Sequence, residues 1–135
     1  MAPELRNRLI EIMKSVVHRD ARVIFAYIYG SFPRGEDFRD IDLAIYVKNP
    51  EENPFVTTSD LMIEMSDEAK KENLEFIPDR FDVNVINDAP FTFLRRVFTE
   101  GILVLDRDPD LRTDVIEFVS SKYRECAGLL AEALL

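Results

Sequence analysis

The chain has 135 residues, of which 47% are hydrophobic and 32% charged, and its formal net charge is −9. This length and balance predict one folded domain over residues 1–135 and exclude a disordered or disulfide-stapled chain. The excess of acidic residues makes nucleic acid a disfavoured partner, because such binding needs clustered Lys and Arg.

The sequence predicts no membrane span and no secretory signal. Its longest apolar run, Val23 to Tyr29, is far shorter than the roughly 20 residues that a membrane helix needs. The N-terminal segment carries Glu4, Arg6 and Arg8 inside an amphipathic pattern and lacks the apolar core of a signal peptide. We therefore expect a cytoplasmic protein.

The first half of the chain predicts a helix and two strands. Apolar residues at helical spacing after Pro3 predict a helix that runs to about His18. The segment from Arg22 to Tyr29 is apolar after its first residue, which is typical of a strand covered on both faces. Clean alternation from Asp40 to Val47 predicts a second strand, with both of its aspartates on the less apolar face.

The second half predicts two helices around two further strands. Thr57 to Ser59 are interpreted as caps for a helix, and alternation from Arg80 to Ile86 predicts a third strand. Asp88 to Pro90 is typical of a helix entry, and Gly101 of its end before a short strand from Ile102 to Leu105. Helices interspersed with strands predict an α/β or α+β domain with a small mixed sheet of about four strands.

A last helix is predicted over about residues 109–134, after Asp108 and Pro109. Cys126 cannot form an internal disulfide, and its helical spacing from neighbouring apolar residues predicts a small core residue. The segment ends in an apolar run from Leu129 to Leu135. Two interpretations stay open: this surface packs on the sheet, or it contacts a partner, including a second copy of the chain.

The most informative stretch runs from Tyr29 to Asp42. Gly30 and Ser31 follow an apolar strand, where a tight turn can present backbone N–H groups and a hydroxyl to an anion. Asp40 and Asp42 lie two residues apart on a strand, so both carboxylates point to the same face. Their repulsion raises the pKa of one of them or recruits a cation, for which hard divalent ions are the usual choice.

Gly30-Ser31, followed by Asp40-Ile41-Asp42, resembles the signature of the DNA polymerase beta nucleotidyltransferase superfamily. Arg34-Gly35 and Asp42-Leu43 extend the resemblance to its minimal nucleotidyltransferase (MNT) branch, in which a third aspartate lies on a following strand. Asp82 matches that position. The resemblance covers roughly residues 20–108 and implies a polymerase beta-like fold.

The resemblance also implies a site for two Mg²⁺ or Mn²⁺ ions, whose metal-binding and catalytic residues would be Asp40, Asp42 and Asp82. The first two would hold the metal on the triphosphate, and the third would complete the second metal site and help to deprotonate an incoming hydroxyl. Gly30, Ser31 and Arg34 would bind the nucleotide phosphates. Because the chain is strongly acidic, a nucleotide would have to arrive with its metal ions.

MNT proteins resemble the antitoxins of two-component systems whose partner is a HEPN-domain ribonuclease toxin. The resemblance therefore implies transfer of AMP from ATP to a hydroxyl acceptor, such as a tyrosine of a HEPN toxin. Two alternatives remain. The same fold could act as a non-catalytic binding module that neutralises a HEPN partner by contact, or as a small-molecule nucleotidyltransferase, for which the usual extra domain around the acceptor is missing.

Overall fold

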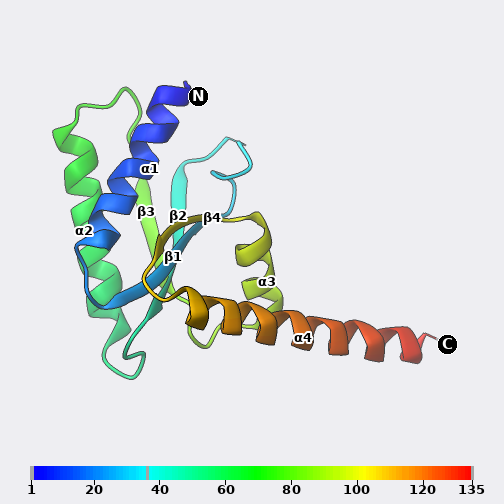
Figure 1. Ribbon diagram of the computed structural model, residues 1–135. Helices are drawn as coiled ribbons and strands as arrows, with labels where there is room; N and C mark the ends of the chain where they lie inside the picture. Colours follow the sequence, from blue (N-terminus) through cyan, green and yellow to red (C-terminus); the bar gives the residue numbers. More distant parts are fainter. Residues whose placement is uncertain (1, 36, 135) are drawn as a thin grey trace.

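The computed structural model describes residues 2–35 and 37–134, which form a four-stranded sheet and its flanking helices (Figure 1). The elements in chain order are α1 (Pro3–His18), β1 (Val23–Tyr29), β2 (Asp40–Val47), α2 (Pro54–Lys71), β3 (Arg80–Val85), α3 (Phe91–Glu100), β4 (Ile102–Asp106) and α4 (Pro109–Ala133). The predicted α+β class with a small mixed sheet is confirmed.

The sheet has the strand order β3-β2-β1-β4. Strand β1 is antiparallel to both of its neighbours, whereas β2 and β3 are parallel. A parallel pair needs a long crossover connection, and α2 supplies it. The parallel pairing places the beginnings of β2 and β3 at the same edge of the sheet, so that residues early in both strands lie side by side.

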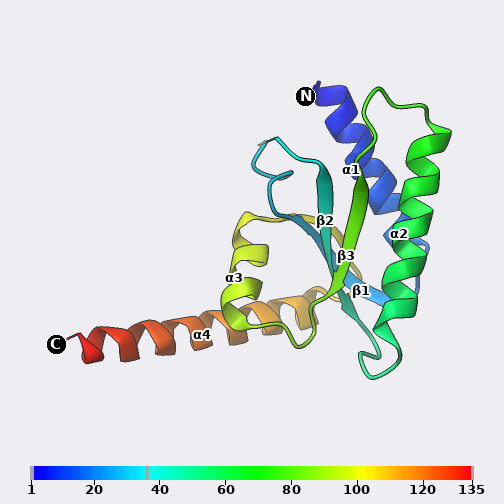
Figure 2. The same cartoon turned by 180° about the vertical axis from the view of Figure 1, so that it is seen from behind.

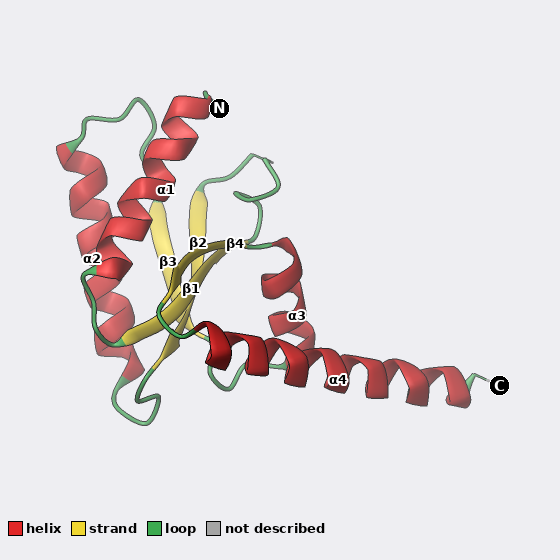
Figure 3. Ribbon diagram, in the orientation of Figure 1, coloured by secondary structure: helices red, strands yellow, loops and turns green. Residues whose placement is uncertain are grey.

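Helices cover the two faces of the sheet unequally (Figures 2 and 3). One face packs against α1 and α2 in a continuous apolar core, to which β2 contributes Ile41, Leu43 and Ile45. The other face packs against α3 and the beginning of α4 in a smaller cluster that includes Ala44 and Val119. As predicted, β1 is buried on both faces. The second face is polar at the starts of β2 and β3.

The start of α2 differs from the prediction. The helix begins at Pro54 and not after Thr57 to Ser59, because the side-chain oxygen of Asn53 caps it by accepting a hydrogen bond from the backbone N–H of Phe55 at 3.0 Å. Pro54 then occupies the first helical position, where its missing N–H costs nothing. Thr57 lies inside the helix and is buried.

The end of α4 corrects a second prediction. Cys126 is exposed and not a core residue, and only Val119 of the whole helix is buried. The C-terminal half of α4 extends away from the sheet in both views (Figures 1 and 2), so the interpretation that it packs on the sheet is wrong. Leu129 and Leu130 remain 68% and 61% exposed. None of the described helices is long and apolar enough to cross a membrane.

Candidate active site

Three aspartates lie on the sheet face that α3 and α4 leave partly open. Asp40 and Asp42 alternate with the buried residues Ile41 and Leu43 on β2, which places both carboxylates on this face. Asp42 pairs directly with Asp82 in the parallel register of β2 and β3. The predicted alternation is therefore confirmed, and it brings a carboxylate from each of two neighbouring strands together. We call this part of the sheet the acidic face.

The turn after β1 packs directly on Asp42. Tyr29, the last residue of β1, pairs with Asp42 in the antiparallel register. Gly30 follows with a φ of +83°, a conformation that residues with a Cβ rarely adopt. A Cβ on Gly30 would lie 2.6 Å from Oδ2 of Asp42. Glycine is thus required here both by its backbone conformation and by the closeness of a site carboxylate.

The chain segment from Ser31 to Gly35 is held in place by two contacts with the rest of the domain. The ring of Phe32 is buried in the core under α1. Arg6 of α1 lies over that ring and donates hydrogen bonds to the carbonyl oxygens of Phe32 and Pro33. These contacts fix the turn that carries the predicted phosphate-binding residues.

Burial and the repulsion between carboxylates raise the pKa of one aspartate of the acidic face. Burial is the largest cause that raises the pKa of Asp42, and the negative charges of Asp82 and then Asp40 raise it further. The Arg80 guanidinium acts in the opposite direction. It lies between the other two aspartates, with Nε 3.7 Å from Oδ2 of Asp40 and Nη2 3.3 Å from Oδ2 of Asp82. Arg80 therefore offsets part of the negative charge of the acidic face.

The donor chemistry of the acidic face fits a hard divalent cation. Its candidate ligands are carboxylate oxygens from two paired strands, and their repulsion would be relieved by a bound positive charge. The three aspartates are not preorganised as a metal site. Residues 2–35 and 37–134 contain no group of three or more His, Cys, Asp or Glu residues close enough together to hold an ion. Arg80 occupies the space between Asp40 and Asp82.

A small cleft adjoins the acidic face on the side of α3. It has a volume of about 160 Å³ and is lined by Tyr29, Gly30, Arg34, Phe93, Arg96, Val97 and Glu100. The predicted nucleotide-binding residue Arg34 lies here, with Nη1 3.7 Å from Oε2 of Glu100. Arg96 adds a second guanidinium, which makes no ion pair within the described part of the chain. The cleft therefore carries positive charge next to the Gly30 turn.

Sequence reasoning missed several residues of this site. The alternation from Arg80 to Ile86 placed Asn84 on the same face as Asp82 and could have placed Arg80 there as well, but it gave neither residue a role in the site. Tyr29 could have been found from its position at the end of the predicted strand, directly before Gly30. Arg96 carries no sequence signal, because only the packing of α3 against β1 brings it beside the turn.

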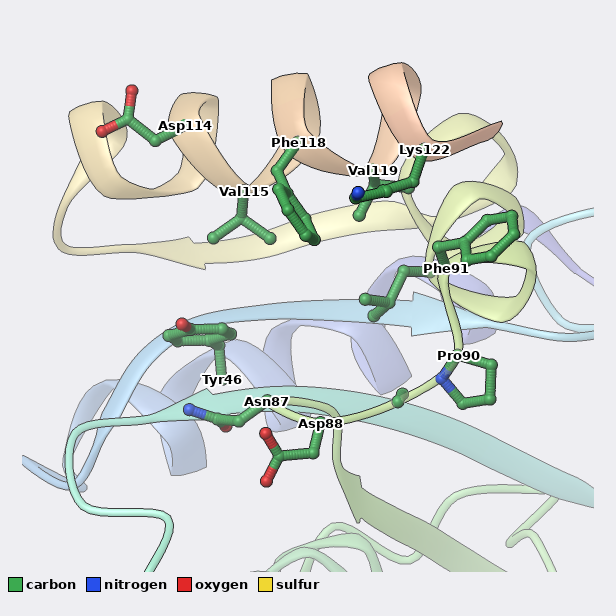
Figure 4. Close-up of a pocket in the computed structure, with 12 residues that line it drawn as sticks. Tyr46, Asn87, Asp88, Pro90, Phe91, Asp114, Val115, Phe118, Val119 and Lys122 are labelled. Carbon is green, nitrogen blue, oxygen red and sulfur yellow. The ribbon is translucent and has the colours of Figure 1, made fainter. Parts of the chain in front are cut away.

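A larger cavity lies on the same sheet face, beyond the acidic face (Figure 4). It has a volume of about 630 Å³. Figure 4 shows Val115, Phe118 and Lys122 of α4 above it, and Tyr46 and Asp88 on its other side. The cavity contains none of the three site aspartates.

The comparisons with known proteins give one family match. Residues 11–110 match the family model described as polymerase beta, nucleotidyltransferase. No curated protein matches the chain. The matched range contains the acidic face, the Gly30 turn and the cleft against α3.

Several solved structures resemble the whole chain. One is the crystal structure of a toxin–antitoxin with AMP-PNP, at 16% identity and a TM-score of 0.61, covering 96% of this chain and 98% of that one. Another is the tri-AMPylated Shewanella oneidensis HEPN toxin in complex with MNT antitoxin, at 15% identity and a TM-score of 0.58, covering 100% of both chains. A third is the toxin–antitoxin MntA-HepT, at 14% identity and a TM-score of 0.57, covering 99% and 100%. At these identities the likeness establishes the fold.

Proposed function

The chain belongs to the polymerase beta nucleotidyltransferase family and has its fold, and from that membership we propose that it transfers AMP from ATP to a hydroxyl group of a HEPN-domain partner protein. The observation that carries this proposal is the pairing of Asp42 with Asp82 across two parallel strands, beneath the turn at Gly30. This arrangement joins carboxylates to an anion-binding turn, as transfer from a nucleoside triphosphate requires.

The nucleotide's phosphates would lie along the turn and the adjoining cleft. Ser31 and the backbone N–H groups of the turn would donate hydrogen bonds to phosphate oxygens. Arg34 and Arg96 line the cleft next to Gly30, so their guanidinium groups can neutralise the charge of the triphosphate tail. These cations offset the repulsion that the acidic face would otherwise exert on an anionic substrate.

The aspartates would hold the metal ions and accept the proton of the acceptor. Asp40, Asp42 and Asp82 would bind Mg²⁺ or Mn²⁺, which stabilises the charge that builds up on the phosphate oxygens during transfer. The acceptor oxygen forms a bond to the α-phosphorus, the bond from that phosphorus to the bridging oxygen breaks, and pyrophosphate leaves. Asp82, which completes the second metal site in this proposal, would help to take up the hydroxyl proton.

A HEPN-domain partner is supported by the structural neighbours, which include an MNT antitoxin in complex with an AMPylated HEPN toxin. The exposed end of α4 supports a protein partner independently. Leu129, Leu130 and Leu134 are all more than half exposed there, and a soluble monomer rarely shows such a surface without using it. A tyrosine hydroxyl of the partner is the acceptor that we propose.

The test is the substitution Asp42→Asn in a transfer assay with α-labelled ATP, Mg²⁺ and a coexpressed HEPN-domain protein. We expect a loss of about 10³-fold or more in transfer rate, equivalent to about 4 kcal/mol of transition-state stabilisation. Asp67→Asn is the matched control, because Asp67 is an exposed aspartate on α2, which packs on the opposite face of the sheet. Near-normal transfer by Asp42→Asn would contradict the assignment.

Neutralisation by contact alone is a second candidate function. It is favoured by one observation: the exposed end of α4 extends away from the acidic face, so partner binding does not need the aspartates (Figure 1). Under this alternative, Asp42→Asn would bind and neutralise a HEPN partner as well as the unchanged protein does. Under the catalytic proposal, the same variant would bind the partner but fail to neutralise it.

A further inference from the structure

The hydroxyl of Tyr29 is tied to a strand that is not its neighbour. Nδ2 of Asn84 on β3 donates a hydrogen bond to Oη of Tyr29 on β1, at 3.0 Å, although β2 separates the two strands. In the register of the sheet, Tyr29 lies opposite Asp42 and Asn84 lies opposite Ala44. The Tyr29 side chain therefore crosses β2 between the positions of Asp42 and Ala44.

Two contacts allow and fix this crossing. Ala44 is fully buried, and its methyl group is small enough to leave room for a ring that passes beside it. On the opposite side, Phe93 of α3 meets the Tyr29 ring edge to face, with ring centroids 5.3 Å apart and an interplanar angle of 89°. The ring is thus held between the sheet and α3.

The direction of the hydrogen bond leaves a proton available. Because the Asn84 amide nitrogen can only donate, Oη of Tyr29 accepts, and its own O–H remains free to donate elsewhere. A phenol ionises only well above neutral pH, so the hydroxyl keeps this proton under ordinary conditions. Tyr29 pairs with Asp42, and Asp42 pairs with Asp82, so this donor lies on the same part of the sheet face as the two carboxylates, although Oη donates to neither of them within the described residues.

We propose that Tyr29 is a positioning residue whose hydroxyl orients the carboxylates of Asp42 and Asp82 toward a divalent cation, and that Asn84 holds Tyr29 in place for this purpose. The inference rests on the proposed function only in taking these two aspartates as metal ligands. It assigns a role to two residues outside the Gly-Ser and Asp-Ile-Asp motifs.

The expected effect follows from how such supporting hydrogen bonds act. A group that hydrogen-bonds a ligating carboxylate fixes its direction, and its loss typically costs 10-fold to 100-fold in metal affinity. Tyr29→Phe keeps the ring, the contact with Phe93 and the cover over Ala44, but removes Oη. Asn84→Ala keeps Oη and removes the amide that holds it. Both changes should thus weaken the same arrangement without disturbing the core.

The experiment measures the affinity for Mn²⁺ alone by isothermal titration calorimetry, together with the melting temperature, on the full chain. We expect Tyr29→Phe and Asn84→Ala each to weaken Mn²⁺ binding by about 10-fold. The double variant should lose no more Mn²⁺ affinity than the single variant that binds Mn²⁺ less tightly, because either change alone already disrupts the pair. Tyr46→Phe is the matched control, since Tyr46 lies further along the same face of β2, stacked on Phe25.

Three results would overturn the proposal. If the unchanged protein binds Mn²⁺ and Tyr29→Phe binds it equally well, the positioning role is wrong and the proposed function stands. If the unchanged protein binds no Mn²⁺, either alone or with a non-hydrolysable ATP analogue, the metal-dependent function itself fails, and this inference fails with it. Additive losses in the double variant would show that Tyr29 and Asn84 act separately, which also contradicts a positioning pair.

Discussion

The acidic face and the C-terminal half of α4 are built in opposite ways. Each aspartate of the acidic face has a position set by strand pairing, with Asp42 opposite both Tyr29 and Asp82. The end of α4 has no such support, and Leu134 near its tip is 79% exposed. At about 1.5 Å per residue the helix is about 37 Å long, enough to extend well past the sheet.

Under the proposed function, the acidic face carries out the chemistry and the end of α4 binds the partner. Chemistry needs side chains held to fractions of an ångström, which a paired sheet provides. Partner recognition needs exposed apolar surface, which a projecting helix provides. If the division is correct, a substitution in one region should leave the property that depends on the other region unchanged. The following experiments test that separation, beginning with the largest expected effect.

Changing the leucines at the end of α4 should abolish tight partner binding. Leu129→Ser with Leu130→Ser removes two apolar side chains whose burial contributes about 1.5–3 kcal/mol each, so the affinity for a HEPN-domain partner should fall by about 100-fold or more. The melting temperature should stay within about 2 °C, because neither side chain packs on the domain. Calorimetric titration of the partner and thermal melts measure both quantities.

Glu132→Gln is the control for that pair of substitutions, because it changes an exposed side chain of the same segment without removing apolar surface. If the leucine variant binds the partner as tightly as the control does, the interface lies elsewhere. If it instead loses several degrees of melting temperature, the end of α4 packs on the domain in solution, and the contrast between the two regions is wrong.

Adding a methyl group at Gly30 should damage the acidic face and leave α4 unaffected. In Gly30→Ala the new Cβ would meet Oδ2 of Asp42 at 2.6 Å, in a backbone conformation that already disfavours alanine by about 1–3 kcal/mol. We expect a lower melting temperature and a loss of about 10-fold to 100-fold in transfer rate, with unchanged partner affinity.

Gly35→Ala separates backbone strain from the contact with Asp42. Gly35 also has a positive φ, of +72°, but apart from its chain neighbours no atom of the described residues lies within 4 Å of the position that its Cβ would take. It should therefore lose stability without a comparable loss of transfer. Equal losses of activity in the two alanine variants would show that the closeness of Gly30 to Asp42 has no role in the site.

Removing the guanidinium of Arg96 should weaken nucleotide binding. Arg96→Gln should raise KM for ATP by about 5-fold to 10-fold, equivalent to about 1 kcal/mol, with a smaller change in kcat. Arg95→Gln is the control, because the neighbouring Arg95 lies over the ring of Tyr123 on α4, at 4.0 Å, and does not line the cleft. If both variants have the same KM for ATP, Arg96 does not contribute to nucleotide binding.

The smallest expected effect is a gain in stability from Asp42→Asn. The folded-state pKa of Asp42 is raised, so its ionisation costs more in the folded than in the unfolded chain. Without metal at neutral pH, the amide should raise the melting temperature by about 1–3 °C. This gain in melting temperature should disappear as the pH falls through the pKa of Asp42, because the protonated carboxyl is then uncharged like the amide of the variant. Melts of both proteins across that pH range measure it.

The sequence predicted the acidic face well because the pattern that defines it is local. Alternation along β2 determines which residues share a face, and it placed Asp40 and Asp42 correctly. Periodicity cannot determine which strands are neighbours, so the pairing of Asp42 with Asp82 became visible only in the sheet order. The same limit hid Arg96, whose position depends on how α3 packs.

The sequence failed at α4 and at the start of α2 for different reasons. Helical periodicity showed that the apolar residues of α4 share a face, but it could not show whether the domain offers a surface to cover that face, so Cys126 was wrongly placed in the core. At α2 the signal was present and was misinterpreted. Asn53 followed by Pro54 marks a helix start more specifically than the hydroxyl residues that follow.

The most direct test of the account follows label from ATP through the reaction. The protein is incubated with Mg²⁺ or Mn²⁺, a HEPN-domain protein and ATP labelled at either the α or the γ phosphate, beside the Asp40→Asn/Asp42→Asn variant. We predict that the α label alone appears on the partner and that the variant transfers none. Transfer of the γ label, or partner neutralisation without any transferred label, would contradict nucleotidyl transfer by the acidic face.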